Sequence, residues 1–367
     1  MSKRPDLFTD YNKEVSIFRN NFQRFWFLIL VVFSIFICFI STDYWLILIT
    51  NALLVSIAAW GLNIVSGLAG QINLAHGVFV GIGTYTSAVL GGVATRSVIG
   101  YELDMIVWLP LSGIVAAIVG VIISPIAVRL KGLNLALVTL ALVFVGSHIF
   151  SNMVFITGGS GIGRRSAKLV LFGNDLSSGI SFGNYFLEEI QIFYILALFM
   201  TILLGIGVKN LVRSKTGRAF AAIRDRDIAA EALGINLFKY KSSALGISCF
   251  YAGIAGALIS TTFGGSEPGT FNLLYSIIFI AIVIIGGPGT VLGPLFGSFF
   301  FTLFPALIQF VILNSNLGEQ DLFLSPQQIE RTIFAMLIIL FVIFEPRGLW
   351  GIWFRLRNYF KAWPFSY

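Results

Sequence analysis

The chain has 367 residues, of which 57% are hydrophobic and 11% are charged, and its formal net charge is +7. A soluble domain typically carries roughly 25% charged residues, so a water-exposed surface could not be covered with so few charges. The composition argues against a soluble enzyme and, with 36 phenylalanines, against a disordered chain. We expect an all-α, polytopic integral membrane protein whose basic residues mark one side of the bilayer and do not bind nucleic acid.

Ten apolar runs approach the length of about 20 residues that crosses a bilayer. They cover 25–41, 44–67, 72–93, 105–128, 133–155, 190–208, 242–263, 272–286, 293–313 and 332–344. The third and eighth are rich in glycine, and the ends of these two crossings are the least defined. We expect some helices to be broken at Gly or Pro, which membranes tolerate only where protein or a water-filled cavity covers the freed backbone. Cys38 and Cys249 lie inside these runs and are expected to be buried free thiols.

The basic residues are distributed unequally between the two sides of this topology. The N-terminal arm, the turn 129–131, the loop 209–241 and the tail hold nineteen Lys and Arg residues, whereas the opposite loops hold four. Cytoplasmic loops carry an excess of Lys and Arg. We therefore expect both termini to lie in the cytoplasm.

This topology predicts one transmembrane domain over residues 25–345. A charged cytoplasmic arm (1–24) precedes it, and no small-residue cleavage site follows the first apolar run, so we expect no cleaved signal peptide. The domain has two substantial loops, 156–189 on the outside and 209–241 in the cytoplasm. The tail (346–367) holds three Trp and four basic residues, which is typical of an interfacial segment in contact with membrane lipids.

The apolar runs contain no Asp, Glu, Lys or Arg. Proton-driven transporters and ion pumps normally place such residues in the membrane, because the charge carries the coupling. His76 and His148 could titrate there, but a structural role is favoured for both. Neither has a partner at ligand spacing, so no metal site is expected. No phosphate-binding P-loop is present, so we expect no cofactor in this chain and no enzymatic activity.

The cytoplasmic loop 209–241 is predicted to contain one helix over 216–234, opened by Gly217 and capped by Gly234. Small apolar residues in it are interrupted by the charged sequence Arg-Asp-Arg-Asp at 224–227. A short helix of this kind either docks on a partner protein or faces lipid headgroups. Composition alone favours neither alternative.

Several stretches resemble the branched-chain amino acid permeases of ABC importers, specifically the LivM type. They are 61–77 (GLNIVSGLAGQINLAHG), 81–85 (GIGTY), 129–132 (RLKG), 138–140 (VTL), 157–160 (TGGS), 214–219 (SKTGRA), 223–224 (IR), 229–230 (AA), 234–236 (GIN), 286–294 (GGPGTVLGP) and 346–349 (PRGL). Each alone is weak. Together they run in order through most of the chain and are specific.

The resemblance implies a permease subunit of an ATP-driven importer in the bacterial inner membrane. It implies four kinds of partner: a second permease of the LivH type, two ATP-binding subunits that hold ATP and Mg, a periplasmic substrate-binding protein and a small polar solute. A homodimer of permeases stays open. The loop 209–241 would then be the coupling loop, with contacts to the ATPase from Gly217, Arg218, Arg224, Asp227, Ala229, Ala230 and Gly234. The Glu-Ala-Ala-x-x-x-Gly core of importer permeases is incomplete here, because Ile228 stands in the place of the glutamate.

Polar residues beside the expected helix breaks are candidates for the translocation path. They are Asn63, Gln71, Asn73 and His76, which could hydrogen-bond a passing polar solute. The same side chains could instead satisfy the freed backbone of the broken helices. The sequence leaves both roles open.

Two alternatives concern the function itself. Within the importer class, related permeases carry urea, short amides or other small carboxylates, and selectivity can rest mostly with the binding protein. In another class, the chain would be a self-sufficient channel or secondary transporter, which would pass solute without ATP or partners. The absence of charges from the apolar runs and the loop 209–241 favour the importer.

Overall fold

The structure is a computed structural model that describes residues 21–130, 132–182, 185–314, 325–345 and 347–362. Its helices are α2 (Asn21–Ile40), α3 (Asp43–Leu62), α4 (His76–Gly91), α5 (Met105–Arg129), α6 (Leu133–Asn152), α7 (Val154–Thr157), α8 (Glu189–Arg213), α9 (Lys215–Asp225), α10 (Asp227–Ala232), α11 (Leu237–Thr262), α12 (Leu273–Gly286), α13 (Gly293–Asn314), α14 (Pro326–Phe344) and α15 (Gly348–Ala362). A π-helical segment, η1 (Asn63–Leu68), continues α3, and η2 (Leu176–Ser178) and η3 (Pro268–Thr270) are 3-10 turns. This arrangement confirms an all-α, multi-pass membrane protein.

Each of the ten apolar runs coincides with a helix of the bundle. Within the described residues, six helical spans are long and apolar enough to cross a bilayer, and they include α3 with η1, α5, α6, α8, α11 and most of α13. Most of α2 and the whole of α12 form shorter apolar helices. The number of crossings and the side on which the termini lie stay predictions.

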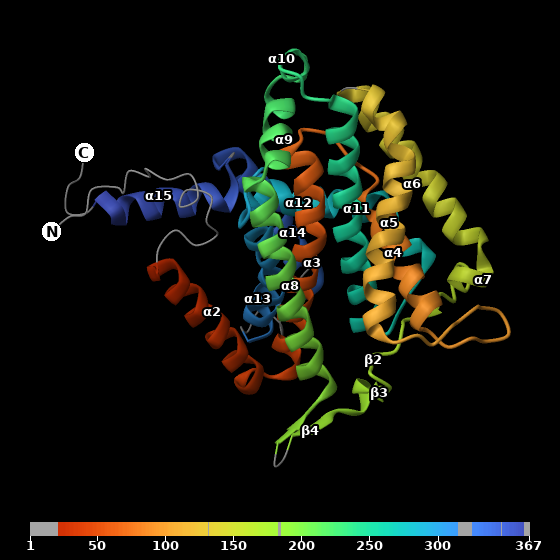
Figure 1. Ribbon diagram of the computed structural model, residues 1–367. Coiled ribbons are helices and arrows are strands. Elements are labelled where there is room, and N and C mark those ends of the chain that lie inside the picture. The colour runs from red at the N-terminus through yellow and green to blue at the C-terminus, as the bar shows by residue number, and fades with distance from the viewer. Residues whose placement is uncertain (1–20, 131, 183–184, 315–324, 346, 363–367) are drawn as a thin grey trace.

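The centre of the bundle is α11, which packs against α5, α4 and α3 (Figure 1). In the apolar stretch of α11, 83% of the residues are buried inside the protein, whereas in the apolar stretches of α5 and α6 only 33% are buried. Small residues allow this close packing, since a Cβ on Gly256 would lie 2.0 Å from the Val80 carbonyl oxygen. Large apolar side chains on α2, α5 and α6 are exposed, as expected for helices whose outer faces meet lipid or another subunit.

The expected break in the third run lies between η1 and α4. Residues 69–75 are not helical, and protein groups satisfy their backbone: the Leu74 N–H donates to Thr139 Oγ1 (3.1 Å) and the Ala75 N–H to Asn73 Oδ1 (3.0 Å). Such a segment is stable at membrane depth only when it is covered in this way. We call residues 69–75 the break.

Short strands gather at one end of the bundle, opposite α9 and α10 (Figure 1). They are β1 (Arg164–Arg165), β2 (Val170–Leu171), β3 (Asn174–Asp175), β4 (Ile180–Phe182), β5 (Tyr185–Leu187) and β6 (Gly265–Ser266), and they pair antiparallel as β1–β6, β2–β3 and β4–β5. Most of them belong to the predicted outer loop 156–189. Arg164 is buried there and donates hydrogen bonds to three backbone carbonyls, those of Ala88, Ile99 and Ile156.

Two further predictions concern the tail and the cysteines. The tail forms α15, which runs sideways from the bundle in Figure 1, and its interfacial role stays a prediction. Cys38 and Cys249 are buried and free, which confirms that they are not part of a disulfide.

Candidate functional site

The predicted coupling helix over 216–234 is two helices, so this part of the sequence interpretation was wrong. α9 begins at Lys215, where the Ser214 hydroxyl caps it by accepting from the Gly217 N–H (3.3 Å). The chain then extends at Arg226, with φ −157°, and α10 begins at Asp227. Two charged side chains that flank the bend have different partners, the Gly67 carbonyl for Arg224 and Lys241 for Asp227. We call residues 214–234 the coupling segment.

Gly217 lies inside the first turn of α9, so the prediction that it opens the helix was wrong, whereas Gly234 follows α10 directly after Leu233. A Cβ at position 217 would lie 2.3 Å from the Leu211 carbonyl oxygen, so a larger residue would not fit the tight passage from α8 to α9. Gly234 has φ +82° after α10, the left-handed geometry in which glycine terminates helices. The predicted cap at Gly234 is therefore confirmed.

One face of α9 packs against the bundle. Gly217, Ala219, Phe220 and Ile223 are buried, and the ring of Phe220 meets Tyr240 edge-on with 6.4 Å between the centroids. Ala230 of α10 is also buried, whereas Arg218 and Ala229 are exposed. The coupling segment is thus fixed to the bundle along one side and presents the other side outward.

Arg224 joins the coupling segment to the break. Its Nη1 donates to the Gly67 carbonyl oxygen at the end of η1 (3.0 Å), and its Nε lies 3.4 Å from Asp225 Oδ1. A Cβ on Gly70 would lie 2.7 Å from Arg224 Cγ, and a Cβ on Gly289 would lie 2.9 Å from Nη1. If α9 is displaced, the break and the loop between α12 and α13 must therefore either move with it or lose their contacts with Arg224.

Asp227 joins α10 to the core helix α11. Its Oδ2 lies 3.7 Å from Lys241 Nζ, and the side chains are 23% and 8% exposed. Burial strengthens such a pair by lowering the local dielectric, and it makes the loss of either partner costly. The coupling segment is therefore attached to the bundle at two charged points, Arg224 and Asp227.

The four candidate path residues are all buried. Asn63 accepts from the Gly289 N–H (2.8 Å) and donates to the Thr290 carbonyl (2.8 Å), so it holds the loop that follows α12. The Gln71 amide donates weakly to the Lys241 carbonyl (3.5 Å). Asn63 thus satisfies backbone groups, while Gln71 lies between the break and α11.

Asn73 and His76 lie deeper in the bundle. The Asn73 side chain accepts from the backbone of the break, and its Nδ2 has no hydrogen-bond partner. His76 Nε2 lies 2.8 Å from the Ala58 carbonyl oxygen, while its buried Nδ1 has no partner. Each residue therefore has one backbone contact and one uncommitted polar atom. Their place on the path stays a prediction.

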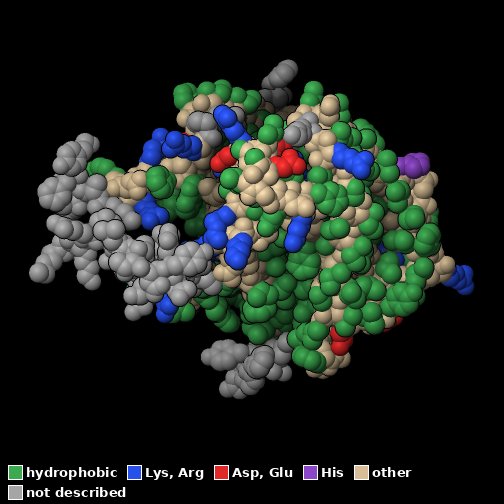
Figure 2. Space-filling view, turned by 45° about the horizontal axis from the view of Figure 1, so that its top comes forward, with side chains coloured by type: hydrophobic (Ala, Val, Ile, Leu, Met, Phe, Trp, Pro, Cys, Tyr) green, Lys and Arg blue, Asp and Glu red, His purple; other side chains and the backbone are tan. Residues whose placement is uncertain are grey.

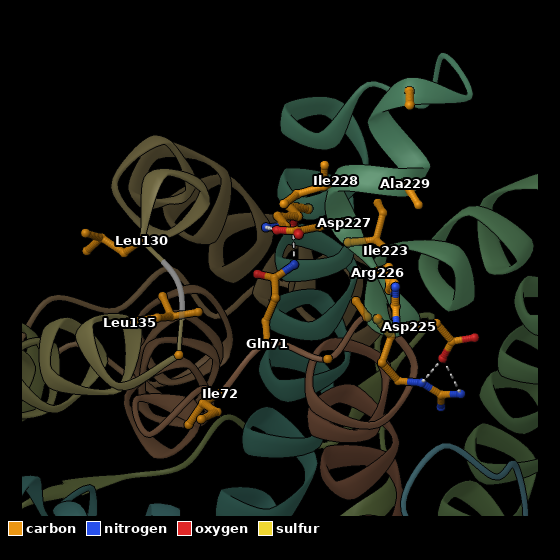
Figure 3. Close-up of a pocket in the computed structure, with 16 residues that line it drawn as sticks. Gln71, Ile72, Leu130, Leu135, Ile223, Asp225, Arg226, Asp227, Ile228 and Ala229 are labelled. Carbon is orange, nitrogen blue, oxygen red and sulfur yellow. Dashed lines mark hydrogen bonds and ion pairs between the residues drawn. The ribbon is translucent and has the colours of Figure 1, made fainter.

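A cavity of about 650 Å³ lies between the coupling segment and the break (Figure 3). Ile72, Leu130 and Leu135 lie on one side, and Ile223, Arg226 and Ala229 on the other. A much smaller void of about 20 Å³ shares Gln71, Ile72 and Leu135 with it and continues past Asn73 and Thr139. Gln71 thus lines the cavity together with the coupling segment, and Asn73 lines the adjoining void.

The surface around the cavity is strongly charged (Figure 2). Lys and Arg side chains, with a few acidic ones, gather on the end of the bundle that carries α9 and α10, and hydrophobic flanks surround it. Among the described residues, no group of three His, Cys, Asp or Glu could hold a metal ion. His148 is exposed and lies beside Asn152.

The comparisons with known proteins fit this arrangement. Residues 44–342, from α3 into α14, match the family described as "Branched-chain amino acid transport system / permease component". The chain belongs to this permease family. The permease is 30% identical over 312 residues to the LivM proteins of Salmonella typhimurium and Escherichia coli, which covers 82% of this chain and 68% of each relative.

More distant relatives include a second kind of permease. The LivH protein of Escherichia coli is 26% identical over 302 residues, with 81% of this chain and 91% of the relative covered. The autoinducer 2 import system permease LsrC of an Enterobacter strain is 24% identical over 241 residues, with 64% of each chain covered. No solved structure matches the permease significantly.

Sequence reasoning missed two members of this site in the permease. Lys241 counted only as one of many cytoplasmic cations, although it lies one residue before an apolar run, where a cation needs a partner. The loop at Gly289 and Thr290 counted only as part of the stretch 286–294, and no pattern linked it to Asn63 across more than 220 residues of sequence. Both contacts depend on tertiary packing.

Proposed function

We propose that this permease is one subunit of an ATP-driven importer for branched-chain amino acids in the bacterial inner membrane. The observation that carries the proposal is the match to LivM proteins, which are named for high-affinity branched-chain amino acid transport, over 82% of the chain. The family match over residues 44–342 spans the coupling segment and the break. It therefore includes Arg224, its partner Gly67 and the candidate path residues.

The subunit forms the translocation path with a second permease of the LivH type. Two ATP-binding subunits are coupled to this pair, and a periplasmic binding protein delivers the solute. Matches to both LivM and LivH support a pair of related permeases. ATP and Mg bind to the ATPase partners, whose closure pushes on the exposed side of the coupling segment. Arg224 and Asp227 pass this displacement to η1 and α11, which is a rigid-body form of alternating access. Gly217, Arg218, Ala229, Ala230 and Gly234 shape the surface that receives it.

The candidate path residues divide into two groups in this proposal. Gln71 and Asn73 lie beside the cavity and the void, so they are the residues that meet the solute. Asn63 and His76 hold backbone carbonyls or amides and fix the walls. The binding protein delivers the solute to the end of the bundle that carries the outer loop 156–189.

A second solute class has one observation in its favour. The LsrC relative is named for autoinducer 2 import, so related permeases serve solutes that are not amino acids. Urea, short amides and other small carboxylates are therefore the alternative cargo. A self-sufficient channel or secondary transporter is the alternative mechanism, and the family assignment counts against it.

The test begins with a mild-detergent pull-down of the chain from its native membrane, followed by mass spectrometry. Recovery of a second permease and two ATPases is the expected result, and the co-purifying binding protein can then be screened for its ligand. The recovered complex, reconstituted with enclosed ATP, should import leucine. Recovery of the chain alone, together with ATP-independent leakage of solute in liposomes, would favour the channel.

A further inference from the structure

The cavity beside the coupling segment has walls of two different kinds. Ile72, Leu130 and Leu135 give it an apolar side that belongs to the break, to the turn between α5 and α6, and to the first turn of α6. The opposite side carries charges of both signs from the coupling segment and the start of α11, since Arg226, Asp227 and Lys241 line it. Figure 3 shows Ile72 and Leu135 across the space from Arg226 and Asp227, with the apolar side chains of Ile223 and Ile228 on the same side as these charges.

The charged side is held in a fixed arrangement. Asp227 and Lys241 form the half-buried pair described above, and the Gln71 amide reaches the Lys241 backbone from below. Arg226 is exposed in the extended bend between α9 and α10. A carboxylate can thus approach the exposed Arg226, and an ammonium group can approach Asp227, which it would share with Lys241.

These walls select among small solutes. A free inorganic anion would meet two carboxylates, those of Asp225 and Asp227, and would leave the apolar side without a contact. A sugar would gain little from the apolar side. An α-amino acid with an aliphatic side chain matches both sides, since its two charges meet charges of opposite sign while its side chain removes apolar surface from water. The volume is also within the range of small-molecule sites.

We propose that this cavity binds a zwitterionic amino acid with an apolar side chain, and that the occupied cavity slows import. The proposal rests on the proposed function, because the amino acid is the imported solute and the cavity lies on the cytoplasmic side. A void of about 20 Å³ lies beside the cavity, shares Gln71, Ile72 and Leu135 with it, and is also lined by Asn73 of the break. Solute released along the break therefore arrives at this site.

The effect on import follows from the two walls. The coupling segment provides one wall and the bundle provides the other, so a bound amino acid bridges two parts that must move relative to each other during a transport cycle. A ligand that binds one arrangement better than another shifts the equilibrium toward it. Accumulated amino acid therefore holds the coupling segment in the arrangement seen here and reduces further import.

The experiment uses the whole complex with its partner subunits in proteoliposomes that enclose ATP. The binding protein and radiolabelled leucine are added outside, and the vesicles contain either no amino acid or unlabelled leucine. We expect luminal leucine to lower initial uptake about fivefold, the lower part of the usual range for coupled sites. Luminal 4-methylpentanoate and 3-methylbutylamine, which lack the ammonium or the carboxylate, should have no effect.

Leu130→Trp fills the cavity from the turn between α5 and α6 and should abolish inhibition by luminal leucine while uptake into empty vesicles continues. Leu133→Trp is the matched control, because Leu133 is 75% exposed and does not line the cavity; it should keep the inhibition. If Leu130→Trp does not assemble, Ile72→Phe narrows the same space and should weaken the inhibition. The proposal would be overturned if luminal leucine did not lower uptake, or if Leu130→Trp and Ile72→Phe left the inhibition unchanged.

Failure of the proposed function has a different signature. The wild-type complex would then import no branched-chain amino acid into empty vesicles. Calorimetric titration of the purified complex with leucine, without binding protein, still decides the cavity in that case. Binding heat that Leu130→Trp removes would support the site, and an absence of binding heat would overturn it.

Discussion

The guanidinium of Arg224 donates a 3.0 Å hydrogen bond to the carbonyl oxygen of Gly67, across 157 residues of sequence. Gly67 lies near the end of the π-helical segment η1, where the helix register has already changed and the break begins. π-Helical turns often mark functional positions. This contact links the coupling segment to the broken helix, so a displacement of either one must move the other or break the hydrogen bond.

Arg224→Ala removes this link. Hydrogen bonds from charged groups are worth about 1.5–3 kcal/mol, so we expect ATP-driven uptake by the reconstituted complex to fall about tenfold while ATP hydrolysis continues. Arg357→Ala, which removes an exposed arginine of α15, is the control and should leave both rates unchanged. Equal losses of uptake and hydrolysis would show that Arg224 serves assembly and not coupling.

The pair of Asp227 and Lys241 should contribute to stability as well as to coupling. Asp227→Asn leaves the Lys241 ammonium, 8% exposed, without its counter-charge, and an uncompensated buried charge is costly. We expect a loss of about 2 kcal/mol in the free energy of unfolding, seen as a lower midpoint of thermal unfolding in detergent. The double variant Asp227→Asn with Lys241→Met should recover part of it.

A second pair of the same charge type provides the comparison for this prediction. Lys168 Nζ lies 4.0 Å from Glu102 Oε2, and both side chains are about half exposed. Surface pairs are worth about 0–1 kcal/mol, so Lys168→Met should change the unfolding midpoint little. If Asp227→Asn is equally harmless, the pair with Lys241 is not a structural attachment.

Much of the fold follows from the sequence because hydrophobic length is a local property. All ten apolar runs contain a helix, and the helix of the glycine-rich third run (72–93) begins only at His76, after the break at 69–75, where Gly70 has φ +68°. The bend at Arg226 was not foreseen. Residues 216–234 have helical composition throughout, and the residues on either side of the bend have distant partners that the local sequence does not reveal, Gly67 for Arg224 and Lys241 for Asp227.

The candidate site was less accessible from the sequence. The polar patch at Gln71, Asn73 and His76 was recognisable because polar residues are rare in apolar runs. Which of these meets a cavity depends on how α9, α10 and the turn between α5 and α6 surround the break. The role of Asn63 was equally hidden, since its partners lie in the loop after α12.

Asn63→Ala distinguishes a structural role from a solute contact. The change leaves the half-buried Gly289 N–H and Thr290 carbonyl without the Asn63 side chain, and each such loss costs up to about 1–3 kcal/mol. We expect a clearly lower unfolding midpoint, whereas Asn152→Ala at an exposed position should have little effect. Normal stability combined with a raised KM for uptake would instead place Asn63 on the path.

Arg164 gives a test at the opposite end of the bundle. Its guanidinium donates to the carbonyls of Ala88 (2.6 Å), Ile156 (2.8 Å) and Ile99, and burial lowers the pKa of this side chain. Arginine remains protonated in proteins and offers five donors in a planar fork.

Arg164→Lys keeps the charge but cannot reach three carbonyls, so some of these buried acceptors lose their partners. We expect a loss of about 2 kcal/mol in stability and faster proteolysis of the loop that contains Ile99. Arg165→Lys is the matched control, because Arg165 is the exposed neighbour. Comparable effects of the two changes would mean that the positive charge matters at this end of the bundle and the fork geometry does not.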